Sequence, residues 1–248
     1  FFCEPLPVML RRLSLPISQA RHEAVVDPRQ GLPVIMLAAR SLSSRPLGQA
    51  RHELSTVVDR WTPQQGFIRA WGGWANSTLA LAQLQSSIGF TVPSFKARAA
   101  ILFEEVGVAL ARADEKSLAD LVTPSCLRSM LPALKARPRG QRHSWTSHGV
   151  TASIKQIRLA HAKQTGGEEQ RRYAQVTCVV DAAMVYEISG AGETASTGSS
   201  EAPHQLCDVW VYERALGDGG SWRLKERLGT LSELQQTSQP NGTGSAQG

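Results

Sequence analysis

The residue types that most often do chemistry are present in this chain, but their spacing matches no known catalytic motif. None of the histidines belongs to an H-E-x-x-H zinc pair, and the chain has neither a G-x-S-x-G nucleophile motif nor a P-loop. Catalysis requires titratable groups that converge in an apolar pocket. Asp181 and Asp208, both expected on strands, have no such partner in the pattern. We therefore expect no enzymatic activity. The six histidines are His22, His52, His143, His148, His161 and His204.

The four cysteines also give no sign of a special site. They lie far apart, and no two form a C-x-x-C pair, which argues against a zinc site and against thioredoxin-like chemistry. Their spacing indicates no disulfide framework either, so a reducing compartment is compatible with the sequence. We expect no metal and no other cofactor. The cysteines are Cys3, Cys126, Cys178 and Cys207.

Positive charge is concentrated in one region. The chain of 248 residues carries a net charge of +6, with a pI near 9.5. Residues 127–172 contain ten basic residues against two acids, Glu168 and Glu169, so their excess is larger than that of the whole chain. Such a region favours an anionic partner, either nucleic acid or an acidic membrane surface. The alternative is that these basic residues form an ordinary solvated surface without a specific partner.

The apolar content, 42%, is sufficient for a folded core over at least part of the chain. The longest apolar runs, such as residues 34–39, are far shorter than the ~20 residues of a membrane-spanning helix. We therefore predict no transmembrane segment. The chain starts at Phe1 rather than at Met. This fits a processed or incomplete form from which a targeting peptide has been removed.

Residues 1–93 are predicted to form an extended arm with short helices. Six prolines in the first sixty residues interrupt helical patterns, and hydrophobic periodicity is poor. Three tryptophans, Trp61, Trp71 and Trp74, fall within fourteen residues and require burial. We favour local packing against the main domain over stacking on bases or a position at a membrane interface.

A folded domain is predicted over residues 94–230, and its first part is helical. Ser94 is the expected N-cap of a long helix with apolar residues at helical spacing from Phe95 to Ala113. Asp114 is expected to cap a second, shorter helix. Pro124 suits the first turn of a third helix, which Pro132 should kink or end.

Strands are predicted to follow the helices. Residues 174–187 alternate between apolar and polar positions, and similar patterns occur over residues 206–214 and 222–228. Residues 150–163 are also strand-like, but Ile154 and Ile157 can share a face only if a β-bulge separates them. The Gly/Ser/Thr/Ala-rich residues 189–203 are expected to be a flexible insertion. Residues 231–248 are predicted to be a disordered polar tail.

Helices followed by antiparallel strands predict an α+β fold. Residues 113–130 and 209–225 make this prediction more specific. The first segment resembles the helix pair of the family of mitochondrial large-subunit ribosomal protein number forty-five, with its Leu-x-x-Leu-Val-Thr followed by Cys and Met. The second resembles that family's final hairpin, in which a strand ending in Glu-Arg leads through a Gly-rich turn into Ser-Trp-Arg. The same domain occurs in the peripheral subunit of the inner-membrane protein translocase and in the yeast membrane-anchored ribosome receptor.

The resemblance implies a nuclear-transport-factor-like cone-shaped roll, in which a curved antiparallel sheet packs on N-terminal helices. It also implies a structural constituent of the mitochondrial large ribosomal subunit, located in the matrix. Such a protein would bind ribosomal RNA near the polypeptide exit and help to orient the ribosome toward the inner membrane. Its partners would be ribosomal RNA, neighbouring large-subunit proteins and, at the membrane, lipid or an insertase. No small-molecule substrate is implied.

Within this function the basic region becomes an RNA-binding candidate, because cationic side chains neutralise phosphates. Pro138 and Gly140 interrupt its first part and predict an irregular loop that conforms to folded RNA. His143, Trp145 and His148 could stack on bases, or could be core or surface residues. The candidate RNA-binding residues are Lys135, Arg137, Arg139, Arg142, Lys155, Arg158, Arg171 and Arg172.

Two alternatives remain open. A peripheral subunit of the inner-membrane import translocase shares the domain, but such proteins carry a long charged helical region before it. Residues 1–93 of this chain are interrupted by prolines instead. An enzyme is the second alternative, since rolls of this superfamily include isomerases and hydrolases that use an Asp or a His inside the cone.

Overall fold

The computed structural model describes residues 53–63, 67–162, 171–190, 193–217 and 219–237. Helices come first in this part of the chain, strands follow, and a short helix ends it. The elements are α1 (Phe67–Ile88), α2 (Val92–Ala111), α3 (Glu115–Leu121), α4 (Pro124–Lys135), β1 (Arg142–His161), β2 (Arg172–Gly190), β3 (Glu193–Thr197), β4 (His204–Leu216), β5 (Arg223–Thr230) and α5 (Leu231–Thr237). The predicted α+β class is confirmed.

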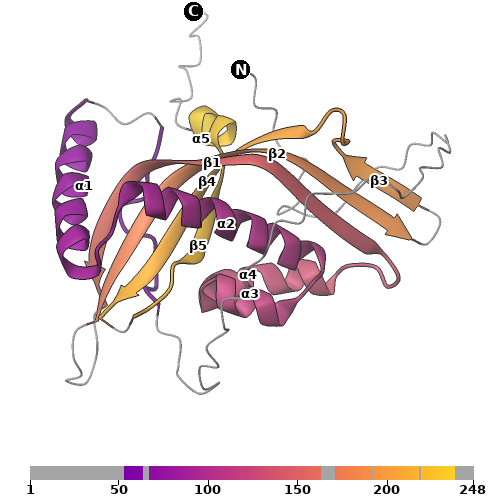
Figure 1. The fold of residues 1–248 in the computed structure, drawn as a ribbon, viewed down its shortest axis with the longest axis horizontal. Helices are drawn as coiled ribbons and strands as arrows, with labels where there is room; N and C mark the ends of the chain where they lie inside the picture. Colours follow the sequence, from indigo (N-terminus) through magenta and orange to yellow (C-terminus); the bar gives the residue numbers. More distant parts are fainter. Residues whose placement is uncertain (1–52, 64–66, 163–170, 191–192, 218, 238–248) are drawn as a thin grey trace, which may run out of the picture.

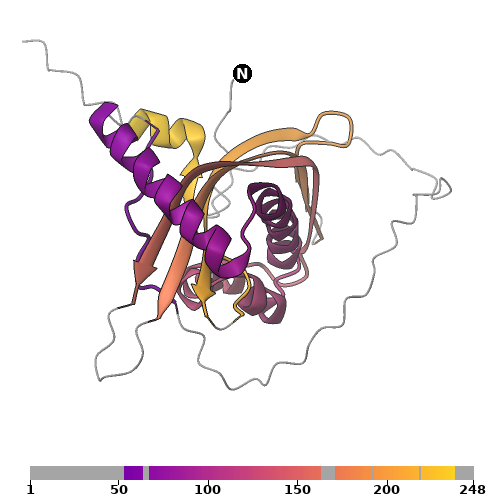
Figure 2. The ribbon, with the colours of Figure 1, turned by 60° about the vertical axis from the view of Figure 1, so that its left-hand side comes forward.

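The strands form one antiparallel sheet in the order β1-β2-β4-β5, and β3 pairs with the end of β2. The sheet curls around α2, while α3 and α4 lie below it, on the same side as α2 (Figure 1). Seen from the side, α2 lies inside the curve of the strands (Figure 2). This is the cone-shaped roll expected from the sequence. The sheet does not close into a barrel, because β1 and β5 do not pair.

The helix α2 positions the core. Its N-cap is Thr91, whose hydroxyl accepts a hydrogen bond from the amide of Ser94 at 3.3 Å, so the cap lies three residues before the predicted one, Ser94. Its buried face carries Phe95, Leu102 and Phe103, which pack against the concave face of the sheet. Tyr212 on β4 donates a hydrogen bond to the carbonyl of Ala99 at 3.1 Å and fixes the helix to the sheet.

The short helices begin where the sequence predicts. The carboxylate of Asp114 accepts a hydrogen bond from the amide of Ser117 at 3.1 Å and caps α3. Pro124 occupies the first turn of α4. This helix continues through Pro132 to Lys135, because one lost backbone hydrogen bond does not end a helix that buries Met130 and Leu134. The helix therefore does not end at Pro132, which was one of the two outcomes predicted for this residue.

The alternation of β2 builds the inner wall of the roll. Its residues at even positions from Val176 to Tyr186 all belong to the main core, as the pattern predicts. In β1 the pairing register shifts between Ile154 and Gln156, which confirms the predicted bulge and lets Ile157 join the core as well. The region predicted as a flexible insertion contains β3, whose five residues pair with residues 186–190 of β2.

The outer face of the sheet is covered as well. Residues 53–63, which we call the N-terminal strap, cross this face, and α5 packs beside them. Trp61 of the strap, with Leu228, Leu231 and Leu234, covers a second apolar cluster of Val179, Cys207 and Val209. Both faces of β2 and β4 are therefore covered over their central parts, which explains why most residues of these strands are buried.

Polar side chains of the outer face hold the backbone of the strap. Gln175 accepts a hydrogen bond from the amide of Val58 at 2.8 Å and donates one to the carbonyl of Thr56 at 3.1 Å. Glu213 accepts from the amide of Leu54 at 3.2 Å, and the ammonium group of Lys225 donates to the carbonyl of the same residue. These buried polar groups are thus satisfied by a segment more than 100 residues away in sequence.

The predicted domain boundaries have to be corrected at two places. The proposed arm of residues 1–93 includes the strap and the 22-residue helix α1, both of which pack on the sheet. The proposed tail of residues 231–248 begins with the helix α5. Residues 1–52 and 238–248 lie outside the described part of the chain.

The tryptophans of this region differ in their surroundings. Trp61 packs on the outer face, as expected, whereas Trp74 on α1 is 63% exposed. The side chain of Trp71 lies outside the described residues. None of the described helices combines the length and the hydropathy that crossing a membrane requires.

Candidate functional site

The open end of the roll encloses a cavity of about 530 Å³ between α2, α4, α5 and the sheet. Its walls are mainly aromatic and aliphatic. The ring of Phe103 lies 4.9 Å from that of Trp210 and 5.7 Å from that of Trp145, and Tyr186 completes this wall. Aromatic pairs at these centroid distances stabilise the interior beyond their buried area.

Asp208, one of the two acidic residues that line the cavity, is already paired. The carboxylate of Asp208 accepts two hydrogen bonds from Arg227, at 2.6 and 2.8 Å, and one from the indole of Trp210 at 3.3 Å. Burial raises the pKa of Asp208, while Arg227 and Trp210 act in the opposite direction. Asp181, the other acid considered for catalysis, is exposed on β2. In the described part of the chain, no three His, Cys, Asp or Glu side chains gather closely enough to hold a metal ion.

Two of the residues proposed to stack on bases face the interior instead. The Nδ1 atom of His143 forms a hydrogen bond with the hydroxyl of Tyr186, and burial together with Arg137 lowers the pKa of this histidine. Trp145 packs on Phe103, and its indole N–H is buried without a hydrogen-bond partner among the described residues. Only His148 is exposed.

The predicted basic loop is fixed to the domain. A guanidinium N–H of Arg137 donates to the carbonyl of Ala111 at the end of α2, at 2.9 Å. Gly140 adopts a φ of +84°, and its carbonyl oxygen lies 2.4 Å from the point where a Cβ atom on Gly190 would stand. The loop is therefore packed against β2 and presents its charges in a fixed arrangement, rather than conforming freely to a partner.

Three of the four basic residues around this loop are exposed. Lys135 ends α4, Arg139 lies in the turn and Arg142 begins β1. We call these three residues the loop patch. Arg137 is half-buried, and burial lowers its pKa. The loop patch therefore offers three cations to an external anion, and Arg137 positions the backbone that carries them.

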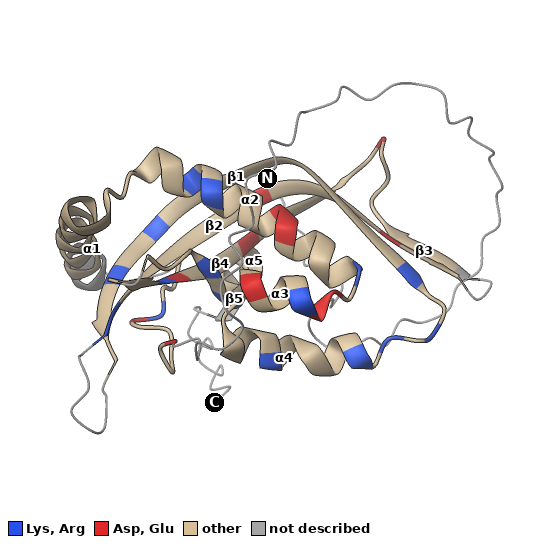
Figure 3. Cartoon of the chain, turned by 60° about the horizontal axis from the view of Figure 1, so that its bottom comes forward, with Lys and Arg blue, Asp and Glu red and all other residues tan. Residues whose placement is uncertain are grey.

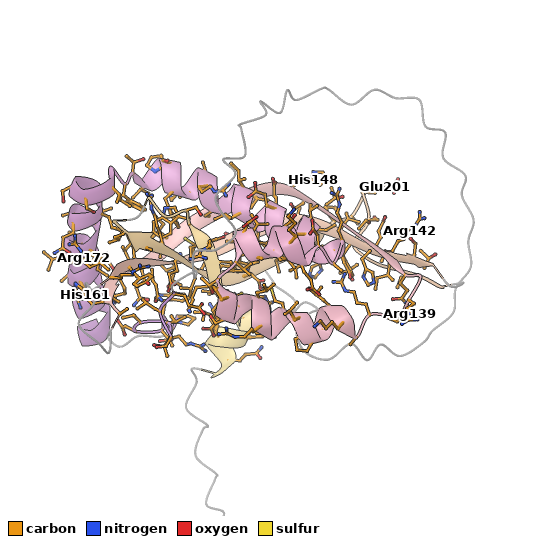
Figure 4. The ribbon with its side chains drawn as sticks, turned by 90° about the horizontal axis from the view of Figure 1, so that it is seen from below. Arg139, Arg142, His148, His161, Arg172 and Glu201 are labelled. Atoms are coloured by element: carbon orange, nitrogen blue, oxygen red, sulfur yellow. The ribbon has the colours of Figure 1, made fainter. Side chains whose placement is uncertain are left out.

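The remaining candidates lie at the other end of the β1–β2 hairpin. Arg172 stands opposite His161 in the register, whereas Arg142 stands opposite Ser189. Lys155 is exposed at the bulge of β1, and Arg171 is half-buried beside Arg172. Figure 4 shows Arg139 and Arg142 at one end of the molecule, and Arg172 and His161 at the opposite end. A single run of basic residues in the sequence thus becomes two separate groups in the fold.

Arg158 does not belong to either group, because its side chain is buried in an ion pair. Its guanidinium donates to Asp59 of the strap at 2.6 and 2.9 Å, and to the hydroxyl of Ser77 on α1 at 2.8 Å. Only 8% of the residue is exposed. It therefore joins the strap and α1 to the sheet, a role that its type and spacing alone did not indicate.

One basic residue of the second group was missed by the sequence analysis. Lys96 is exposed near the start of α2, the helix that packs against β1, and both Lys96 and Lys155 act electrostatically on the buried thiol of Cys178. Burial is the larger effect, and it raises the pKa of Cys178 to about 12. We call Lys96, Lys155 and Arg172 the strand patch. The contact between α2 and β1 that brings Lys96 here has no local signal in the sequence.

Comparison with protein-family models identifies a Tim44-like domain over residues 79–228. The match spans more than half of the chain and includes α2, α3, α4, the strands β1 to β4 and most of β5. A search of curated proteins found no match. The matched domain has the nuclear-transport-factor-like fold, in agreement with the roll described above.

Proposed function

Because the chain belongs to the Tim44-like domain family, we propose that it is a non-enzymatic, RNA-binding protein of the mitochondrial large ribosomal subunit. The family includes both import-associated and ribosome-associated proteins, and it points to a mitochondrial location. In this proposal the chain resides in the matrix and binds ribosomal RNA near the polypeptide exit. It helps there to orient the ribosome toward the inner membrane.

The observation that carries this proposal is the loop patch. Lys135, Arg139 and Arg142 are exposed on a loop that Arg137 and Gly140 fix to the domain. Because the backbone that carries these cations is fixed, only their side chains need to be ordered when they bind phosphates, and this arrangement suits a folded RNA. In the assembled subunit, neighbouring large-subunit proteins would contact the chain on the same side as this RNA.

Two features favour the ribosome over the import translocase. The first is the resemblance of residues 113–130 and 209–225 to the ribosomal family, described above. The second is α1, which carries a single charged residue, Arg69, in its 22 residues. The import subunits have a long charged helical region before this domain, and α1 does not have that character.

A structural role also accounts for the polar groups of the cavity. Asp208 and Arg227 neutralise each other, and the hydroxyl of Tyr186 is bonded to His143. In the enzyme alternative an Asp or a His would have to be available to a substrate inside the cone. The proposal also includes inner-membrane lipid or an insertase as partners of the assembled ribosome.

The proposal is tested by binding the purified chain to purified mitochondrial large subunits at increasing salt concentrations. We expect the combined substitution Lys135→Gln, Arg139→Gln and Arg142→Gln to weaken binding at least tenfold near physiological salt. The matched control replaces three arginines that are paired with acids, Arg60→Gln, Arg98→Gln and Arg128→Gln. Equal binding by the wild type and the loop-patch variant would contradict the proposal. Binding to the import translocase instead of the ribosome would favour the alternative.

A further inference from the structure

The loop patch and the strand patch are far apart in the fold. Arg142 begins β1, and the partner of Arg172 in the register, His161, ends it. The nineteen residue steps between Arg142 and His161 correspond to about 60 Å along the strand at ~3.3 Å per residue. Lys155, the member of the strand patch nearest to Arg142 along β1, is still about 40 Å away along the same strand.

The surface between the patches does not favour phosphate. The exposed positions of β1 between Arg142 and Lys155 carry no formal charge; they are Ser144, Thr146, His148, Gly149 and Thr151. Glu187 of β2 lies across from Ser144, and its carboxylate accepts a hydrogen bond from the hydroxyl of Ser144 at 3.1 Å.

The middle of α2 is acidic, with Glu104 and Glu105 both exposed. Figure 3 shows acidic segments on α2 and α3 between the two ends of the molecule, together with basic segments on α3 and α4. An RNA backbone that followed the surface along α2 from one patch to the other would pass these exposed carboxylates, which repel phosphate.

We propose that the two patches bind two separate RNA segments, so that the domain bridges them. This inference rests on the proposed function and specifies the partner. Each patch offers three exposed cations, and the sheet and α2 hold the two sets at a fixed separation. A bridge of this kind requires the roll to stay rigid along β1, which pairs with β2 at both ends and packs on α2 and α1.

Bridging is measured with two short RNA duplexes of about one helical turn each. One duplex is held on beads through biotin, and the other carries a fluorophore. The wild-type chain should retain the fluorescent duplex on the beads. Neutralising either patch should lower this retention at least tenfold, while leaving binding to a single duplex measurable. The strand-patch variant is Lys96→Gln, Lys155→Gln and Arg172→Gln, and the loop-patch variant is the one described above.

Salt dependence gives a second readout on the same variants. Each patch should contribute about 2 to 3 to the slope of the logarithm of the binding constant against the logarithm of the salt concentration, since each cation contributes about 0.9. The control with Arg60→Gln, Arg98→Gln and Arg128→Gln should bridge like the wild type, because these arginines are paired with acids.

The results distinguish a failure of the proposed function from a failure of the bridging inference. If the wild type binds no duplex even at low salt, the proposed function and the bridging both fall. If it binds RNA but does not bridge, or if either variant bridges like the wild type, the bridging inference is wrong and the proposed function stands. A mixture of the two variants must not restore bridging. Restoration would show that two associated copies of the chain make the bridge, and it would overturn the inference.

Discussion

The ammonium nitrogen of Lys225 on β5 lies 3.1 Å from a carboxylate oxygen of Glu53, a residue 172 positions earlier in the chain. The same oxygen accepts a hydrogen bond from the hydroxyl of Ser125 on α4, at 2.7 Å. Burial raises the pKa of Glu53, but the hydrogen bonds from Ser125 and the charge of Lys225 outweigh this and lower it. One ion pair thus joins the N-terminal strap, the last strand and α4.

Removing the cation of this pair should destabilise the domain strongly. Lys225 is 4% exposed, so Lys225→Met removes the donor of the Leu54 carbonyl and leaves the carboxylate of Glu53 with only Ser125 and the longer contact with Arg128. We expect a loss of about 3 kcal/mol in the free energy of unfolding, the usual cost of breaking a buried pair from one side. Urea denaturation of the purified chain measures this quantity.

An exposed pair provides the control for this prediction. Arg98 and Glu105 lie 3.3 Å apart with about two fifths of each side chain accessible, so Arg98→Gln should cost less than about 1 kcal/mol. The double variant Glu53→Gln with Lys225→Met should cost less than the sum of the two single variants. A Lys225→Met chain as stable as Arg98→Gln would show that the strap does not stabilise the sheet.

The strap is the first part of the chain that the structure describes, and truncation tests its contribution to stability. A chain that begins at Glu53 keeps the strap and serves as the reference. A chain that begins at Pro63 should lose several degrees or aggregate, because Gln175, Glu213 and Arg158 then lack their partners. Differential scanning calorimetry compares the two. Equal unfolding temperatures would contradict the role assigned to the strap.

The parts of the fold that could be predicted are those with a local signal. The alternation of β2 and the helical spacing of α2 are visible in the sequence because each element buries one face against a single core. The bulge at Lys155 was also predictable, since Ile154 and Ile157 can share a face only with an extra residue between them.

The strap and α1 could not be predicted in the same way. The backbone of the strap is held by side chains of β2, β4 and β5, and side chains of β1 bind its Asp59, so its own sequence shows no periodicity. Gly72, Gly73 and the scarcity of charged residues hide the amphipathic character of α1. The Gly/Ser/Thr composition around β3 concealed its pairing, because that strand lies beyond the core.

The close approach of Gly107 to Trp145 gives a packing prediction. A Cβ atom on this glycine of α2 would stand 2.4 Å from the indole nitrogen of Trp145 and 2.5 Å from a ring carbon. Gly107→Ala must therefore displace a ring that lines the cavity, and we expect it to cost about 1 to 3 kcal/mol. Denaturation curves provide the measurement.

Gly72 is the matched control for this substitution. It is also helical, but nothing lies within 4 Å of its Cβ position, so Gly72→Ala should stabilise the chain by up to about 1 kcal/mol. If Gly107→Ala is equally stabilising, the packing of Trp145 against α2 is not as described.

His143 should make stability depend on pH. Burial and Arg137 lower its pKa, so the folded chain holds a neutral imidazole and binds a proton less readily than the unfolded chain does. Its contribution to stability is therefore complete above the unfolded pKa of about 6.5 and decreases as the pH falls below that value. The difference in unfolding free energy between the wild type and His143→Gln should decrease from about pH 7.5 to about pH 5.5. A constant difference would show that His143 titrates normally.

Most residues of the candidate site could be predicted, with the exception of Lys96, but its geometry could not. Counting charges along the sequence identified Lys135, Arg139, Arg142 and Lys155, because an exposed cation can be recognised without knowing its neighbours in the fold. It could not show that Arg158 is buried beside Asp59, or that the hairpin separates the remaining residues into two patches. Both facts depend on which strand positions face the strap and where the turns fall.

Sedimentation of a mitochondrial lysate through a sucrose gradient, with and without ribonuclease, tests the central claim most directly. We predict that the chain migrates with a large-subunit marker at moderate salt, and that RNA digestion releases it. Migration with the inner-membrane translocase, unaffected by ribonuclease, would contradict the ribosomal assignment and support an import function.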